Sequence, residues 1–206
     1  MQQPNWEEFH HIPKSNPQLN WEEFSHITKN NPPWPRLVRA VSLLGHTGEA
    51  LDLGCGGGRD TRYLLAHGFQ VTAVDNEAAS LAALADLPRE HLHLVQSTFE
   101  DFSFTSYDLI NAHFALPFTQ KEQFSAVFAR LKAALKPGGI FVGQFFGVND
   151  TWNTPETKMT FFTREQAHTQ LAGLEIVEFE EEDRDGTTAR GDVKHWHVYH
   201  IVARHP

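Results

Sequence analysis

Two hydrophobic periods alternate along most of the chain. Short apolar runs of strand length occur at 50–53, 71–74, 91–95, 108–112 and 140–146. Between them, apolar residues recur at helical spacing and predict helices over 36–44, 60–66, 78–87 and 120–135. Strands that alternate with helices favour a parallel sheet covered by helices on both faces.

The C-terminal part predicts a reversal of chain direction. A helix over 163–171, capped by Thr163, precedes two strands at 174–179 and 195–202, which we expect an acidic loop to connect. The resulting fold class is α/β: a doubly wound, Rossmann-like, seven-stranded sheet, mostly parallel with one antiparallel C-terminal strand. A reversed last strand would begin at the carboxyl edge of the parallel strands and bring residues 194–197 to that edge.

The N-terminal region contains a duplication. Residues 5–17 recur at 20–32, offset by fifteen positions, and a Pro-Pro-Trp-Pro segment follows. One extra copy is too few for a solenoid. We therefore divide the chain into an N-terminal duplicated segment and lid, 1–35, and one domain, 36–206. Trp21 and Phe24 would either clamp the mouth of the site or cap the core.

Composition narrows the classes of partner. The 206 residues carry a formal net charge of −9 and no cluster of basic residues, which argues against nucleic-acid binding. We find neither an 18-residue apolar run nor a charged-then-apolar leader, and expect no membrane association and a cytoplasmic location. The single cysteine, Cys55, lies in a turn that needs a small side chain. We expect a monomer or homodimer.

The candidate chemistry lies in residues 50–61 and 71–75. An apolar strand runs into glycines at 54, 56, 57 and 58 and then a helix, and a second apolar strand ends on Asp75. Glycines let a ligand approach bare backbone, and an acid at the end of the second strand accepts hydrogen bonds from a ribose diol. This pattern predicts an adenosine site.

The glycine spacing favours one kind of adenosine ligand. A dinucleotide fold needs Gly-x-Gly-x-x-Gly, and Arg59 stands where its third glycine belongs. Asp52 would repel phosphates and favour a cation. S-adenosylmethionine carries a sulfonium and an ammonium and has no phosphate. An NAD-dependent oxidoreductase and a non-catalytic module that binds an adenosyl ligand remain the alternatives.

From this turn onward the chain resembles the class I S-adenosylmethionine-dependent methyltransferases. Residues 97–104 resemble their adenine segment, 107–113 their fourth strand and 135–142 the turn into their fifth, so the resemblance covers about residues 34–206. The Gly-Arg-Asp-Thr run, 58–61, is closest to the subgroup of tellurite-resistance methyltransferases. The resemblance implies in-line methyl transfer to a small-molecule acceptor without a metal.

Candidate site residues follow from the motif and the resemblance. His113, just after the fourth strand, is the best candidate base, and His197 is the second candidate catalytic residue. His195 and His197 could ligate a metal, but no third ligand is suitably spaced, and we expect no metal site. The expected cofactor-binding residues are Asp52, Gly54, Cys55, Gly56, Asp75, Asn76, Thr98, Phe99, Glu100 and Asn111.

Overall fold

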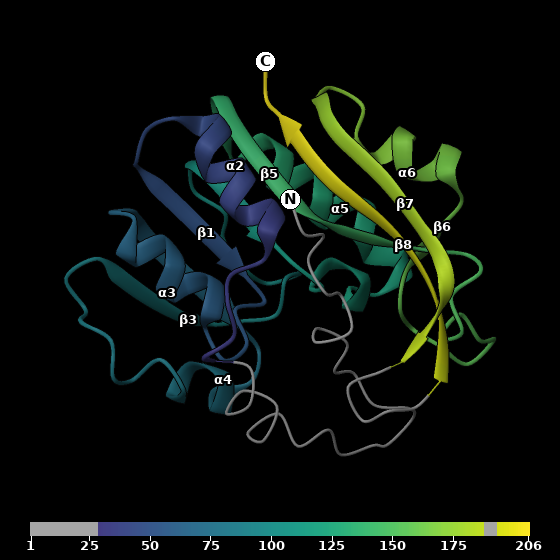
Figure 1. Ribbon diagram of the computed structural model, residues 1–206, viewed down its shortest axis with the longest axis horizontal. Helices are drawn as coiled ribbons and strands as arrows, with labels where there is room; N and C mark the ends of the chain where they lie inside the picture. Colours follow the sequence, from purple (N-terminus) through teal and green to yellow (C-terminus); the bar gives the residue numbers. More distant parts are fainter. Residues whose placement is uncertain (1–28, 188–192) are drawn as a thin grey trace.

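The computed structural model describes residues 29–187 and 193–206 (Figure 1). The duplicated segment and the proposed clamp of Trp21 and Phe24 therefore lie outside the described residues. The division into 1–35 and 36–206 stays a prediction.

A single twisted sheet runs through the protein in the order β3-β2-β1-β4-β5-β8-β7 (Figure 1). The strands are β1 Glu49–Leu53, β2 Gln70–Asp75, β3 Leu92–Gln96, β4 Tyr107–Ala112, β5 Leu135–Gly147, β6 Phe161–Phe162, β7 Glu175–Thr187 and β8 Val193–Arg204. The eighth strand, which sequence reasoning did not predict, is the two-residue β6 beside the end of β5. β8 is antiparallel to both neighbours, as predicted, and the other pairings are parallel.

The five predicted helices are present, one of them clearly shortened, and the short 3-10 helix η2 was not predicted. The helices are α2 Pro35–Leu44, α3 Arg59–Ala66, α4 Ala78–Ala82, η2 Leu116–Phe118, α5 Lys121–Ala133 and α6 Arg164–Gln170. α4 ends five residues earlier than expected because Leu84, Ala85 and Leu87 bond the carbonyl three residues back, as tight turns do. Thr163 caps α6 as predicted, in a capping box with Gln166.

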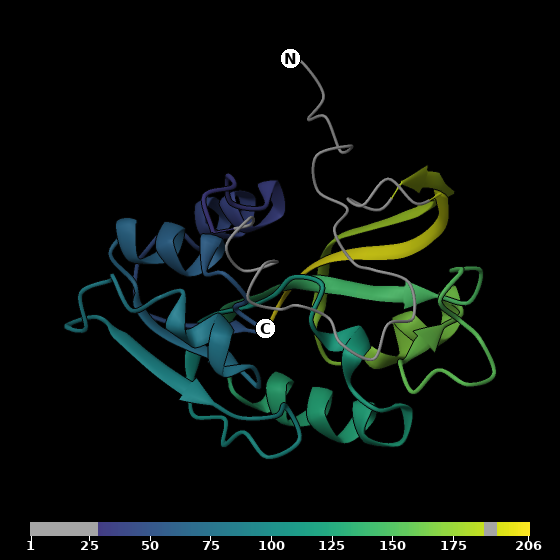
Figure 2. The ribbon, with the colours of Figure 1, turned by 90° about the horizontal axis from the view of Figure 1, so that it is seen from below.

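Two cores cover the two faces of the sheet. Under α5, five phenylalanines contact one another: Phe124, Phe128, Phe141, Phe145 and Phe162. The opposite face packs against α2 and α3, and Figure 2 shows α2 and α5 on opposite sides of the sheet. These two layers fix the carboxyl ends of β1, β2 and β4, where the glycine turn lies.

The acidic run after residue 177 is a strand and not the connecting loop we expected. β7 pairs with β8 along its length, with Asp183 opposite His197 and Asp185 opposite His195. Strand formation is compatible with so many carboxylates because cationic and histidine side chains lie beside them. Arg36 on α2, for example, contacts both Glu178 and Glu180.

Candidate functional site

The glycine turn between β1 and α3 is closed by backbone hydrogen bonds to the end of β2. The N–H groups of Gly54 and Cys55 both donate to the carbonyl of Val74, at 2.8 and 3.0 Å. Gly54 and Gly58 have positive φ, and a Cβ on either would collide with Ala115 or Leu84. These two glycines are therefore required by packing.

Gly56 differs from its neighbours because its outer side is open. Its φ is +50°, and an added Cβ would meet nothing within 4 Å. Its N–H donates to Asp75 Oδ2 at 2.9 Å, so the backbone is held although no side chain covers it. Bare, ordered backbone of this kind is what a ligand needs for close approach.

Asp75 ends β2 as predicted and holds the turn from the far side. Its Oδ1 accepts from the Glu77 N–H at 2.9 Å, and the residue is 9% exposed. Burial raises the pKa of this carboxyl, and the backbone donors of Glu77 and Gly56 oppose the rise. The Asp75 carboxylate thus lies at the edge of the open turn and holds its backbone.

Two more carboxylates form a buried pair beneath the turn. The Asn111 amide nitrogen lies 2.8 Å from Asp52 Oδ1 and 3.0 Å from Asp60 Oδ2. Thr61 Oγ1 donates to the other Asp52 oxygen at 2.5 Å. Burial, then the charge of Asp60, raises the pKa of Asp52 to about 7, because a second buried negative charge beside Asp60 is unfavourable. Sequence reasoning found Asp52 and missed Asp60, although it lies in the Gly-Arg-Asp-Thr run.

His113 completes this network. Its Nδ1 makes a short hydrogen bond to Asn111 Oδ1 and lies 3.6 Å from Asp60 Oδ2. The ring stacks on Trp34, with centroids 5.5 Å apart, and the Arg59 guanidinium covers the same indole at 3.9 Å. Burial, then the charge of Arg59, holds the pKa of His113 well below its ordinary value, so the ring is neutral.

Phe114, the residue after His113, has a strained backbone. It is the only non-glycine residue with a positive φ, 49°, in the described part of the chain. The Gln144 side chain accepts its N–H at 2.7 Å. The conformation places its ring 5.0 Å from Trp34 and 6.2 Å from Phe146, joining His113 to an aromatic cluster beyond β5.

The expected adenine segment is only partly assembled at the turn. Phe99 lies beside Gly54, since a Cβ on that glycine would be 3.3 Å from the phenyl ring. The Thr98 hydroxyl donates to Asp101 Oδ2 at 2.8 Å, and the Glu100 carbonyl accepts from Arg130 at 2.7 Å. Asn76 is exposed and follows Asp75 directly. Their roles in ligand binding stay predictions.

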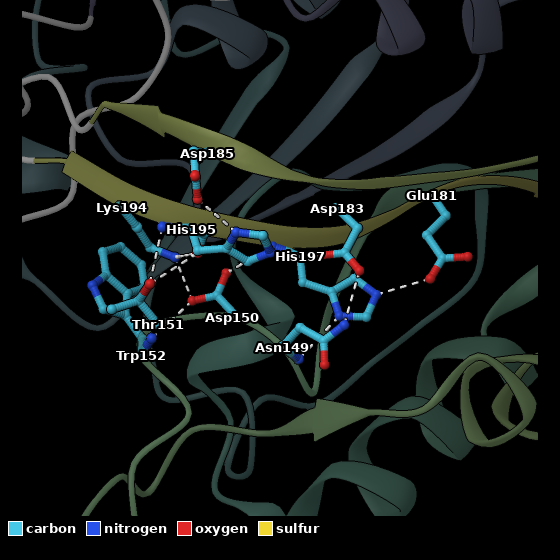
Figure 3. A network of polar contacts seen from close by, with 10 residues as sticks. All are labelled: Asn149, Asp150, Thr151, Trp152, Glu181, Asp183, Asp185, Lys194, His195 and His197. Carbon is cyan, nitrogen blue, oxygen red and sulfur yellow. Dashed lines mark hydrogen bonds and ion pairs between the residues drawn. The ribbon is translucent and has the colours of Figure 1, made fainter.

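The start of β8 reaches the carboxyl edge of the sheet, but most of its side chains turn inward (Figure 3). Lys194 is 2% exposed and forms a short ion pair with Asp150, among the rings of Trp152 and Trp196. Burial lowers the pKa of Lys194 to about 8. Lys194 thus ties the loop after β5 to β8.

His197 is also buried, and both ring nitrogens have partners. Nδ1 accepts the Asn149 N–H at 3.0 Å, and Nε2 lies 2.9 Å from Glu181 Oε1 (Figure 3). His195 instead bridges Asp183 and Asp185 at 2.6 and 2.7 Å, and these hydrogen bonds raise its pKa. His200 is buried, as expected for a mid-strand position.

Glu181, Asp183 and His197 offer ligand atoms within 4.8 Å of one another, and so form a candidate metal site. The hydrogen bonds of His197 argue against it. Because Nδ1 accepts a backbone N–H, the proton of the neutral ring is on Nε2, the atom that would have to bind the metal. Metal-bound histidines normally have the reverse arrangement, with the distal nitrogen donating.

Comparison with known proteins agrees with this geometry. Residues 50–139 match a family model described as a methyltransferase domain. This match, with the strand order and the glycine turn, supports the predicted family, the class I S-adenosylmethionine-dependent methyltransferases. The predicted α/β fold is confirmed.

Individual relatives match in part. The chain is 29% identical over 140 residues to hemagglutinin 1 of Eikenella corrodens, covering 65% of this chain and 46% of the relative. It is 34% identical over 96 residues to an uncharacterised methyltransferase of Synechocystis, covering 45% of this chain and 44% of the relative. The chain thus spans less than half the length of these relatives.

Solved structures extend the fold match over most of the chain. TehB from Haemophilus influenzae superposes with a TM-score of 0.74 and 21% identity, covering 90% of this chain and 66% of TehB. A Burkholderia thailandensis N1-methyltransferase of 1,6-didemethyltoxoflavin, with bound S-adenosylhomocysteine, gives a TM-score of 0.65 and 21% identity. The superposition covers 94% of this chain and 94% of that enzyme. At this identity the likeness concerns the fold.

Proposed function

We propose that this protein transfers a methyl group from S-adenosylmethionine to a small-molecule acceptor by in-line displacement, without a metal. The observation that carries the proposal is the open, ordered Gly56 backbone tied to Asp75, beside a buried pair of carboxylates. The donor set suits this cofactor, since Asp75 fits a ribose diol and the Asp52–Asp60 pair favours a cation.

The cofactor supplies an activated methyl group with a good leaving group. The residues of the chain then bind and orient it and exclude water. Asp52 is 2% exposed and hydrogen-bonded on both oxygens. It therefore acts on the cofactor through the electrostatic field of its charge and not by direct contact. Gly54, Cys55, Asn76, Thr98, Phe99, Glu100 and Asn111 complete the proposed cofactor site.

The proposed acceptor site lies between His113 and the aromatic cluster of Phe114, Phe146 and Trp152. His113 is the proposed base or hydrogen-bond partner of the acceptor. His197 holds Glu181 and the Asn149 loop, and we propose that it contributes by positioning this loop beside the site. A small acceptor accords with the structurally similar Burkholderia thailandensis enzyme, which is a 1,6-didemethyltoxoflavin-N1-methyltransferase.

Thermal shift tests the cofactor. S-adenosylmethionine and S-adenosylhomocysteine should stabilise the protein, by about 2.7 kcal/mol at a hundredfold excess over Kd, whereas NAD and ATP should not. Stabilisation by NAD alone would establish the oxidoreductase alternative. Asp75→Ala should reduce the shift, to about half at the same ligand concentration if binding weakens tenfold. Glu90→Ala, which removes an exposed carboxylate before β3, is the matched control.

A screen of small-molecule acceptors tests catalysis. Release of S-adenosylhomocysteine with one of them separates an enzyme from a module that only binds the adenosyl ligand. We further propose that the protein is a cytoplasmic monomer or homodimer that binds neither nucleic acid nor membrane. None of the helices in the described part of the chain is long and apolar enough to cross a bilayer.

A further inference from the structure

The orientation of the Asn111 side chain is fixed by chemistry. It is 1% exposed at the end of β4, and one end of its amide lies between Asp52 and Asp60. Carboxylates accept hydrogen bonds, and an amide oxygen at this position would face two acceptors. The NH2 group must therefore point to the carboxylates, and the amide oxygen must point to His113.

This orientation determines the protonation state of the histidine. An amide oxygen only accepts, so Nδ1 of His113 must carry the hydrogen of its bond to Asn111. In a neutral imidazole the other nitrogen, Nε2, then carries a lone pair. A second proton is disfavoured because the ring is buried and Arg59, Arg36 and His200 act against its charge, while Asp60 lies on the Nδ1 side.

We propose that Asn111, held by Asp52 and Asp60, is a positioning residue that locks His113 in the tautomer with Nδ1 protonated and Nε2 free to accept. The tautomer itself does not depend on the proposed function. Only its consequence does, namely that Nε2 receives a hydrogen from the methyl acceptor. The acceptor must then bring an N–H or O–H nucleophile.

The proton and electron balance is simple. The acceptor atom loses its hydrogen to Nε2 and uses the released electron pair to bond the methyl carbon. The carbon–sulfur bond breaks, and the sulfur keeps its electron pair. His113 leaves the step as an imidazolium, whose Nδ1 proton still faces Asn111 Oδ1 and Asp60. Release of the Nε2 proton to solvent then restores the neutral ring with its hydrogen on Nδ1.

Nitrogen NMR on protein labelled with ¹⁵N-histidine tests the lock without cofactor or acceptor. His113→Gln assigns the ring signals. In the wild type at pH 7.5, Nδ1 of His113 should be the protonated nitrogen and Nε2 the bare one. In Asn111→Leu the share of the Nε2-protonated form should rise, because Nδ1 loses its amide acceptor and keeps only the more distant Asp60. The matched control Asn153→Leu, which removes an exposed amide bonded to the Val148 carbonyl, should leave the spectrum unchanged.

A wild-type spectrum with hydrogen on Nε2, or an Asn111→Leu spectrum identical to the wild type, would overturn the proposal. The wild-type measurement decides it even if Asn111→Leu fails to fold. Failure of the proposed function is distinguishable, because it would show as no thermal shift with S-adenosylmethionine while the tautomer is unaffected. With an acceptor found in the screen, Asn111→Leu should lower kcat more than it raises KM.

Discussion

Asp52→Asn should stabilise the protein without its ligand while weakening the binding of S-adenosylmethionine. Asp52 is buried beside Asp60, and its pKa rises from 3.8 to about 7. The asparagine oxygen can still accept from Asn111, and its NH2 can donate to Thr61 Oγ1, although the Thr61 hydroxyl hydrogen then loses the acceptor that Asp52 provides. The substitution therefore removes a buried charge and keeps a hydrogen bond to each of the two partners.

The size and sign follow from proton linkage. The unfolded chain releases this proton near pH 3.8, but the folded protein holds it until about pH 7. The folded state thus binds more protons between these values, and its stability falls as the pH rises through this window. The loss is at most about 4 kcal/mol, at about 1.36 kcal/mol for each pH unit between the two pKa values.

Denaturant unfolding at pH 5 and pH 8 measures this effect. At pH 8, Asp52→Asn should be more stable than the wild type by up to about 4 kcal/mol. Each kcal/mol corresponds to about 2–4 °C in Tm for a domain of this size. The advantage should shrink at pH 5, where the folded wild-type carboxyl is protonated. Glu90→Gln, which neutralises an exposed carboxylate before β3, is the control.

Calorimetry completes the test. S-adenosylmethionine should bind at least tenfold more weakly to Asp52→Asn, because the charge that favours its cationic groups is halved. A variant less stable than the wild type at pH 8, or one with unchanged affinity, would refute the reasoning that this carboxylate is held at a folding cost for a cationic ligand.

Four further substitutions test other parts of the structure. Asp75→Ala should weaken cofactor binding at least tenfold, since charged hydrogen bonds contribute about 1.5–3 kcal/mol, and unchanged affinity by calorimetry would mean that another residue holds the ribose. Gly56→Val should block the cofactor with the fold still measurable by circular dichroism, whereas Gly58→Ala should lower Tm because its Cβ meets Leu84 at 1.9 Å; equal Tm values would contradict the packing argument. Lys194→Met should destabilise the protein by about 3–5 kcal/mol by leaving Asp150 buried without its cation, and chemical denaturation checks this.

The sequence alone predicted the strand and helix order, the single reversed strand and the turn that ends at Asp75. These features are local, because apolar periodicity, glycine and a carboxylate at a strand end have the same meaning in many contexts. The acidic run was mispredicted as a loop because its strand does not follow from local sequence. It forms through pairing with β8 and ion pairs with α2, which are far away in the sequence.

Only the tertiary structure decided the chemistry around Asn111. The sequence marked Asp52 and His113 separately and placed Asn111 among the cofactor contacts. Folding brings Asp60 and Trp34 to the same place and buries all of them together. Burial and proximity raise the pKa of Asp52 and underlie the proton position that we propose for His113, and both depend on neighbours that are far apart in the sequence. The sequence therefore predicted an adenosyl site, because its motif is local, whereas only the fold assembled the Asp52–Asn111–His113 network.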